Sequence, residues 1–225
     1  MAYEAQGRRR PAWGSARTGP GCRAYLQDYA ALLDAVSFPS VVLDHRWNVV
    51  LANDAYDVLF GGAGPHPTAM PRDNFLRFVL FHPDAATVLG DHESSWCLPM
   101  LAHFAEALER HVGDEELQAI RAAIADDPIM DAAYRHGLPR WISSVGAEAI
   151  ANDGALRPLT HPDPRWGRTH CRVVGEAPQT LQDMGFFRLT LVLREPLRAG
   201  GGRRPVRRAA RRAVGYLRAV PAADG

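Results

Sequence analysis

The segment from Val41 to Gly62, VVLDHRWNVVLANDAYDVLFGG, constrains the fold of this chain more than any other stretch. It holds two short runs of alternating apolar residues, 41–43 and 47–51, on either side of a polar break. Alternation with a period of two is typical of β-strands, so the break between the runs predicts a β-hairpin. Asn53 then stands where a helix N-cap is needed, and Gly61 stands where a helix can end in the left-handed conformation. We therefore expect a hairpin that leads directly into a short helix.

Helical periodicity recurs on both sides of this segment. Apolar residues spaced three and four apart predict amphipathic helices, and polar caps mark where they begin. The predicted helices span residues 25–36, 74–81, 95–111 and 128–137, and one more helix is predicted to begin at residues 114–116. Residues 74–81 are so apolar that periodicity does not distinguish a buried helix from a buried strand, and the strand is kept as the alternative. The last helix has Asp127 as N-cap and Pro128 at its first position, and it is expected to stop at Gly137.

The chain then returns to strands. Residues 169–174 are one candidate, and residues 186–194 (FFRLTLVLR) alternate more regularly than any other run. The side chains expected to face inward are Phe187, Leu189, Leu191 and Leu193, and those expected to face outward are Arg188, Thr190 and Arg194. One solvated face implies an antiparallel sheet. The order of hairpin, helices and closing strands predicts an α+β fold, with helices packed on one side of that sheet.

Charge and composition divide the 225 residues into three parts. Residues 1–24 carry five arginines against Glu4 without hydrophobic periodicity, so we expect a disordered, Arg-rich N-terminus. Residues 25–196 form the predicted domain, and residues 25–195 hold 13 arginines against 23 acidic residues. Such an acidic body should not attract nucleic acid by its charge.

Residues 197–225 combine a glycine linker with a basic tail. Apolar residues recur there at helical spacing, and the opposite face carries the candidate contacts to nucleic acid or a partner, Arg207, Arg208, Arg211 and Arg212. A basic amphipathic helix can contact phosphates, anionic lipid or an acidic partner. The alternative is a disordered tail.

Several other classes of function find no support in the sequence. The apolar runs are far shorter than the roughly 20 residues of a membrane-spanning helix, and the N-terminus has no apolar signal region. We therefore expect a cytoplasmic protein without a transmembrane segment. The histidines between residues 92 and 111 match no metal-binding spacing, and Ser143 and Ser144 lie outside any nucleophile motif. No metal, no cofactor and no enzymatic activity are expected.

Several short motifs point to a known family. They are DHRWNV at 44–49, ANDA at 52–55, NFLRF at 74–78, FHPDA at 81–85 and HP at 161–162. In order and spacing these motifs resemble the ligand-binding domain of MmyB-like transcription regulators over about residues 28–195. The resemblance implies a PAS-like fold, an interior that holds a small apolar, fatty-acyl-like ligand, and transcription control in actinobacteria. Members of the family normally carry an N-terminal helix-turn-helix, and we expect no such motif in the 24 poorly patterned residues before this body.

A ligand-binding interior needs reserved space, which predicts the residues that line it. The candidates are Trp47, Phe75, Phe78, Trp96, Met100 and Phe104, with Asn74 and Arg77 as polar anchors. Arg77 lies inside an apolar run, where its guanidinium can receive a carboxylate through two hydrogen bonds. The alternative is that the aromatic residues fill a close-packed core, Asn74 caps a helix and Arg77 pairs with an acid of the body.

Together these features predict a regulatory sensor whose main partner is an apolar small molecule. DNA is then contacted only indirectly, through a partner or through the basic tail, and a homodimer is left open. The competing hypothesis is a nucleic-acid-binding protein that uses its Arg-rich tail and keeps the body as a scaffold. An enzyme acting on an acyl substrate is disfavoured, because no nucleophile and base are paired in the sequence.

Overall fold

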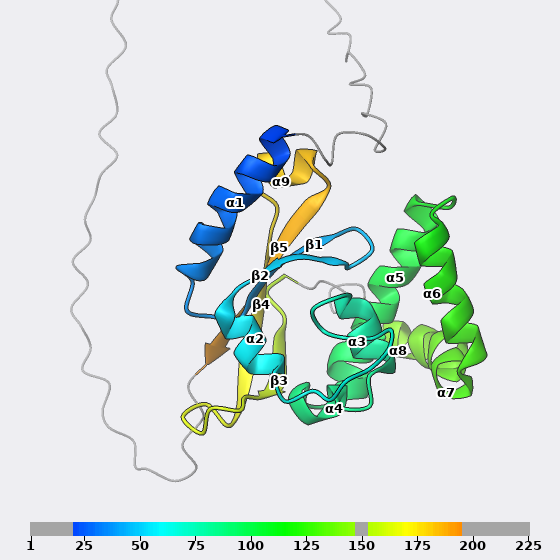
Figure 1. The fold of residues 1–225 in the computed structure, drawn as a ribbon. Coiled ribbons are helices and arrows are strands. Elements are labelled where there is room, and N and C mark those ends of the chain that lie inside the picture. The colour runs from blue at the N-terminus through cyan, green and yellow to red at the C-terminus, as the bar shows by residue number, and fades with distance from the viewer. Residues whose placement is uncertain (1–19, 147–152, 195–225) are drawn as a thin grey trace, which may run out of the picture.

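Five antiparallel strands form one sheet in the computed structural model, which describes residues 20–146 and 153–194 (Figure 1). The strands are β1 (Ser40–Asp44), β2 (Val49–Ala52), β3 (Leu156–Thr160), β4 (Arg168–Glu176) and β5 (Phe186–Arg194). Their spatial order is β2-β1-β5-β4-β3, and each neighbouring pair is antiparallel. The last strand therefore lies in the middle of the sheet, between the N-terminal hairpin and β4.

The described residues between the hairpin and β3 are mostly helical. Together with α1 before the hairpin and α9 between β4 and β5, the helices of the described residues are α1 (Pro20–Asp34), α2 (Asp54–Phe60), α3 (Phe75–Phe81), α4 (Ala85–Val88), η2 (His92–Cys97), α5 (Leu98–Arg110), α6 (Glu115–Asp126), α7 (Pro128–Ala132), η3 (Ala133–Gly137), α8 (Leu138–Val145) and α9 (Gln179–Asp183). The segments η2 and η3 are π-helices. None of the helices in the described ranges is long and apolar enough to cross a membrane.

The two faces of the sheet bury different side chains. Val41 and Leu43 of β1 belong to the large core formed with α2 to α8, whereas Val42 belongs to a smaller core formed with α1 and α9. Figure 1 shows α1 and α9 on one side of the sheet and α3 to α8 on the other. The α+β class and the antiparallel sheet are confirmed. The expectation of one solvated face needs correction, because α1 covers the Val42 face and Thr190, predicted to point outward, is buried against Ser40.

The hairpin and the helix that follows it are confirmed, and Asn53 joins them. Its side-chain oxygen accepts hydrogen bonds from the backbone N–H of Tyr56 at 3.0 Å and of Ser40 at 2.9 Å. Its amide nitrogen donates to three carbonyl oxygens, those of Leu33, Val36 and Phe38. Asn53 therefore caps α2 and ties the end of α1 to the start of the sheet.

Gly61 ends α2 for a different reason from the one predicted. Its φ is −65°, which is right-handed and not left-handed. A Cβ atom at this position would lie 2.9 Å from the carbonyl oxygen of Asp57. Glycine is therefore needed here for a close backbone approach.

Several boundaries also differ from the predictions. The first helix begins at Pro20, so residues 20–24 of the segment expected to be disordered are helical. The predicted 95–111 helix is divided into η2 and α5, and the predicted stop at Gly137 is wrong, because Gly137 has a helical φ and the chain continues into α8. Strand β3 was not predicted, since residues 156–160 contain a proline and lack a regular apolar alternation.

Candidate ligand-binding site

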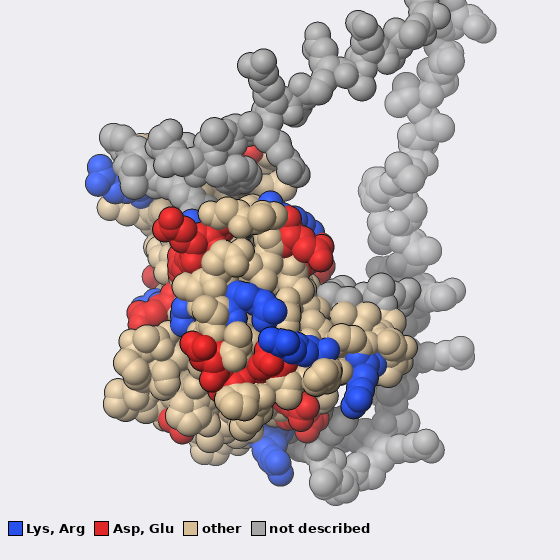
Figure 2. All heavy atoms as spheres, turned by 90° about the vertical axis from the view of Figure 1, so that its right-hand side faces the viewer, with Lys and Arg blue, Asp and Glu red and all other residues tan. Residues whose placement is uncertain are grey.

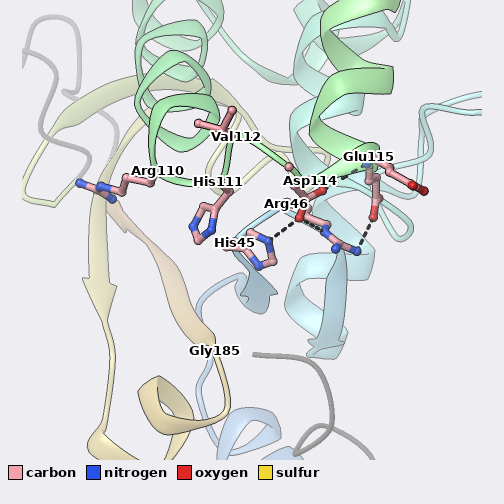
Figure 3. A pocket seen from close by; sticks show the side chains of 10 residues that line it. His45, Arg46, Arg110, His111, Val112, Asp114, Glu115 and Gly185 are labelled. Carbon is pink, nitrogen blue, oxygen red and sulfur yellow. Dashed lines mark hydrogen bonds and ion pairs between the residues drawn. The ribbon is translucent and has the colours of Figure 1, made fainter. Parts of the chain in front are cut away.

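A cleft opens between the tip of the hairpin and the loop that joins α5 to α6 (Figure 3). Its mouth has a volume of about 1100 Å³. The lining residues are His45, Arg46, Arg110, His111, Val112, Gly113, Asp114, Glu115, Glu116 and Gly185. The mouth of the cleft is therefore polar, with charged groups of both signs and two imidazoles.

The cleft continues between α5 and the start of β5, where the buried residues Trp47, Ala107 and Phe186 form part of its wall. This deeper part has a volume of about 340 Å³ and shares His45, Arg110, His111 and Gly185 with the mouth. Its remaining lining residues are Trp47, His103, Glu106, Ala107, Ala177, Gln182, Phe186 and Phe187. Ligand pockets in proteins usually enclose about 300–1,000 Å³ and combine apolar walls with a few polar groups. The deeper part of the cleft meets both criteria.

The hairpin tip holds Trp47 in a fixed position beside this cleft. The Asp44 carboxylate accepts hydrogen bonds from the backbone N–H of Arg46 at 2.8 Å and of Asn48 at 3.0 Å. Trp47 has a φ of +62°, which is uncommon for a bulky residue, and its carbonyl oxygen accepts from the Phe75 N–H at 3.0 Å. A strained conformation persists only where its surroundings enforce it, and such residues cluster at functional sites.

Ion pairs join the hairpin tip to the N-terminus of α6 across the mouth of the cleft (Figure 3). The Asp114 carboxylate lies 2.9 Å from Nε2 of His45 and 2.7 Å from Nε of Arg46. Arg46 also contacts Glu116 at 3.0 Å. We call His45, Arg46, Asp114 and Glu116 the hairpin–α6 cluster. The His111 ring lies against His45, with 4.5 Å between the ring centroids.

Asp114 has two structural functions in this cluster. Its other carboxylate oxygen caps α6 by accepting from the N–H groups of Glu116 and Leu117. Partial burial raises the pKa of this carboxyl, but the hydrogen bonds from His45, Arg46 and the Leu117 N–H outweigh that effect and lower the pKa to about 2. The carboxylate therefore stays ionised throughout the neutral range.

A second, closed hollow lies deeper in the core, and we call it the seam. Its volume is only about 10 Å³, which is about enough for one water molecule. It is lined by Val41, Tyr56, Phe75, Trp96, Met100, Arg157, Val173, Leu189 and Leu191. In the structure as it stands, the seam is too small for an acyl chain.

Arg157 is the charged member of this otherwise apolar and aromatic lining, as far as the described residues show. Its side chain is buried, and its guanidinium carbon lies 5.1 Å from the centroid of the Trp96 ring. Burial lowers the pKa of Arg157 to about 10, so the group still carries its charge at neutral pH. Trp96 in turn donates its indole N–H to the carbonyl oxygen of Pro158 at 3.0 Å.

The predicted aromatic residues fall into three places. Trp47 lines the cleft, whereas Phe75, Trp96 and Met100 line the seam. Phe78 and Phe104 are fully buried in the main core, with Phe78 against Phe60 and Phe104 against Tyr134. The structure thus brings three of the six predicted residues together at the seam.

The two predicted polar anchors do not lie with them. Asn74 caps α3 by accepting from the Arg77 N–H, and its amide donates to the Arg46 carbonyl and the Asn48 side chain, which is a structural function. Arg77 lines a shallow surface groove beside Asp126, Asp127 and other residues of α6 and α7. Residues 75, 76, 78, 79 and 80 of α3 are buried, so position 77 is left on the outward side of the helix.

Sequence reasoning missed His45, Arg46, Asp114 and Arg157 as members of the two hollows. One signal could have found Arg157. Residues two apart in a strand share a face, so Arg157 points the same way as the inward-facing Leu159, but the strand itself was not recognised. The four tail arginines at 207, 208, 211 and 212 lie outside the described residues. Within the described ranges, no three metal-ligating side chains converge on one point.

The sheet order β2-β1-β5-β4-β3, with hollows between the sheet and the helices, defines the class of PAS-like sensor domains. Residues 27–137 match the family model of the MmyB-like transcription regulator ligand binding domain, which confirms the expected resemblance for this part of the chain. The match is shorter than the expected 28–195, since it runs from α1 to η3 and stops before β3. No curated protein matches the chain.

Proposed function

We propose that this domain senses an amphiphilic small molecule with a fatty-acyl-like chain, and that the chain enters the deeper part of the cleft. The observation that carries the proposal is the 340 Å³ hollow over Trp47, Ala107 and Phe187, which opens into a polar mouth. The match to a ligand-binding domain of transcription regulators supports it. Following the same resemblance, we place the protein in the cytoplasm of an actinobacterium.

The lining of the cleft suits a molecule with an apolar and a polar part. An acyl chain against Trp47, Ala107 and Phe187 leaves water at a gain of about 0.8 kcal/mol for each methylene group. About ten buried methylenes therefore contribute roughly 8 kcal/mol before the entropic cost of association is subtracted. The imidazoles and arginines at the mouth supply hydrogen bonds for polar atoms of the ligand.

Binding in this cleft would affect the contact between the sheet and the helices. The cleft is bounded by the hairpin tip on one side and by α5 and α6 on the other, and the hairpin–α6 cluster bridges the two. A ligand that fits one separation of these elements better than another shifts the population towards it. A partner protein, or the basic tail, then conveys the change to DNA.

The face that carries α6 and α7 does not resemble a nucleic-acid-binding surface. Figure 2 shows acidic and basic side chains interspersed on it, with no patch of a single sign. Binding to the phosphate backbone requires clustered cations. This face therefore favours the sensor hypothesis over direct DNA contact by the body.

The test is ligand binding by the full chain, measured by native mass spectrometry and titration calorimetry with a series of fatty acids. We expect Ala107→Leu to weaken binding about tenfold or more, because the added atoms occupy the floor of the cleft where the chain would lie.

Ala105→Leu is the matched control, since Ala105 lies on the same helix and is only partly buried. An unaltered protein that takes up no fatty acid contradicts the proposed function. Equal binding by the Ala107 and Ala105 variants would instead show that the ligand does not lie in this cleft.

A further inference from the structure

The face of the sheet that turns away from α6 and α7 carries a row of cationic and imidazole side chains on β4. Arg168, His170 and Arg172 are exposed, and they alternate with buried residues of the same strand. Residues two apart in a strand share a face, so the three side chains project from the same side of the sheet. Over the four residues from Arg168 to Arg172 the row extends about 13 Å.

Strand β5 adds a fourth side chain to this row. Arg194 is exposed and is paired with His170 across the antiparallel ladder. Side chains directly opposite each other in such a pair have their Cβ atoms about 5 Å apart. We call Arg168, His170, Arg172 and Arg194 the sheet patch. The fold thus gathers three arginines in one place, although residues 25–195 carry 13 arginines against 23 acidic residues.

The sheet patch lies outside the smaller core, which covers the other half of this face. That core packs α1 and α9 against β1, β2 and the start of β5, and none of its described members lies on β3 or β4. Figure 1 shows the two helices in the upper part of the view and β3 in the lower part. On β3, the positions paired with the patch are occupied by Leu156, Pro158 and Thr160. The patch is therefore open to solvent, and its neighbours across β3 are uncharged.

The arginines of the sheet patch also lack the ion pairs that other arginines of the body make. In the part of the chain that the structure describes, acidic side chains pair with Arg46, Arg72, Arg110, Arg135, Arg165 and Arg188. The same residues include no ion pair of Arg168, Arg172 or Arg194. Arg172 donates to the carbonyl oxygen of Gly154 at 2.5 Å, which is a neutral acceptor. The patch therefore presents positive charge that an anionic partner can neutralise.

The basic tail begins where the sheet patch ends. Arg194 is the last residue of β5, and residues 197–225 hold eight arginines against Asp224. The first of these arginines, Arg198, follows four residues after Arg194, which is at most about 14 Å along the chain. A long and evenly charged polyanion can therefore contact the patch and the tail together.

We propose that the sheet patch contacts the phosphate backbone of DNA and that the basic tail extends this contact. Double-stranded DNA carries one phosphate per 3.4 Å along each strand, so a row of about 13 Å faces roughly four phosphates of one strand. Guanidinium groups donate paired hydrogen bonds to phosphate oxygens, and a neutral imidazole donates one N–H. Contacts of this kind position a protein on DNA without reading its sequence. The inference goes beyond ligand sensing and does not depend on a ligand in the cleft.

Two other anionic partners fit the sheet patch less well. A protein surface that lies on a membrane inserts apolar side chains beside its cations. Among the described residues of β3, β4 and β5, Leu156 is the large apolar side chain that is exposed. An acidic protein segment matches the charge of the patch, but it lacks the regular row of charges that DNA offers to the patch and the tail together.

The test is binding of the full chain to a fluorescein-labelled duplex of 20 base pairs, measured by fluorescence anisotropy between 50 and 200 mM salt. The triple variant Arg168→Gln, Arg172→Gln and Arg194→Gln should bind about tenfold or more weakly. It should also lower the slope of log K against log salt by about 2 to 3, since each lost phosphate contact removes about 0.9.

A second triple variant is the matched control. Arg72→Gln, Arg135→Gln and Arg140→Gln remove three exposed charges from other parts of the body, so the net charge changes equally. This control should keep the slope of the unaltered chain. With Arg207, Arg208, Arg211 and Arg212 all changed to glutamine, the tail contribution falls, and the substitutions in the sheet patch should still lower the slope further.

Each other outcome overturns the inference. No binding by the unaltered chain at 50 mM salt, or an unchanged slope in the patch variant, would show that the sheet does not contact DNA. Equal losses in the two triple variants would show an effect of net charge alone. Patch-dependent binding to polyglutamate or to phosphatidylglycerol vesicles, without binding to the duplex, would identify an acidic protein or a membrane as the partner.

Arginine footprinting of the unaltered chain provides a test that does not depend on a folded variant. Phenylglyoxal modifies exposed arginines, and mass spectrometry reads the rate at each position. We expect the duplex to slow the modification of Arg168, Arg172 and Arg194 and to leave that of Arg140 unchanged. Protection confined to residues 203–218 would contradict the inference, because the tail alone would then hold the DNA.

Discussion

At the scale of single residues, Asn53 connects more parts of the fold than its N-cap position suggests. One side chain satisfies backbone groups from α1, from the segment before β1 and from α2, and it is 1% exposed. Each buried backbone group that loses its partner costs about 1–3 kcal/mol. The residue is therefore a structural centre and not a ligand contact.

Replacing Asn53 by alanine should destabilise the protein by about 3 kcal/mol or more, because the cap and the buried amide contacts are lost together. Asn53→Asp should be at least as destabilising as the alanine variant, since it keeps the cap acceptor but places a buried carboxylate oxygen against the carbonyl oxygens that the amide now contacts. Urea unfolding followed by circular dichroism measures both changes. An alanine variant within 1 kcal/mol of the unaltered protein, well below the estimate above, would show that the neighbouring carbonyl groups find other partners.

At the scale of elements, the hairpin–α6 cluster joins two parts of the chain that lie far apart in sequence. Its central hydrogen bond links His45 to Asp114, which are 69 residues apart. The Asp114 side chain is 8% exposed and that of Arg46 is 34% exposed, so solvent weakens the pair only in part. The cluster therefore sets the spacing between the hairpin tip and α6.

The pKa of Asp114 gives this cluster a defined pH dependence. Because the pKa is lowered to about 2 in the folded protein, the cluster's contribution is complete above the unfolded pKa near 4 and is lost as the pH falls towards 2. We expect Asp114→Asn to be less stable than the unaltered protein by about 1 kcal/mol at pH 7, and the difference to shrink through this acid range.

Denaturant titrations at several pH values measure this difference. Asp127→Asn is the matched control, because Asp127 caps α7 through the N–H groups of Ile129 and Met130 in the way that Asp114 caps α6. A difference at Asp114 that does not vary with pH would mean that the ion pairs add nothing beyond the cap.

At the scale of the whole molecule, the family match and the folding unit differ in extent. Residues 27–137 carry the hairpin and most helices, but β5 pairs with β1 over five positions from outside that range. Without β5, the paired edge of β1 and the inner face of the sheet lose their partners.

A chain that stops at residue 145 should therefore fail to fold cooperatively, whereas a chain that stops at residue 195 should retain the fold. Far-ultraviolet circular dichroism and urea unfolding of the two fragments measure this contrast. A cooperative transition in the shorter fragment would show that the helices form a stable unit without the closing strands.

Local features explain why much of the fold was predictable. The hairpin, the caps Asn53, Asn74 and Asp127, and the alternation of residues 186–194 depend on neighbours within a few positions of the chain. The site was less predictable. Arg77 lies within the apolar run of α3, but it occupies an outward-facing position of that helix. Arg157 belongs to no recognisable pattern in the sequence, yet its side chain is buried in the core.

The sequence by itself determined the α+β class, the N-caps and the family resemblance of residues 27–137, because periodicity, capping and motif spacing act over short stretches of chain. Only the tertiary structure decided which residues meet at the cleft and the seam. Trp96 contacts Pro158 across 62 residues, and β5 lies between β1 and β4, so these walls come together only when the sheet is closed. Contacts of that range depend on strand register, which no local pattern in the chain specifies.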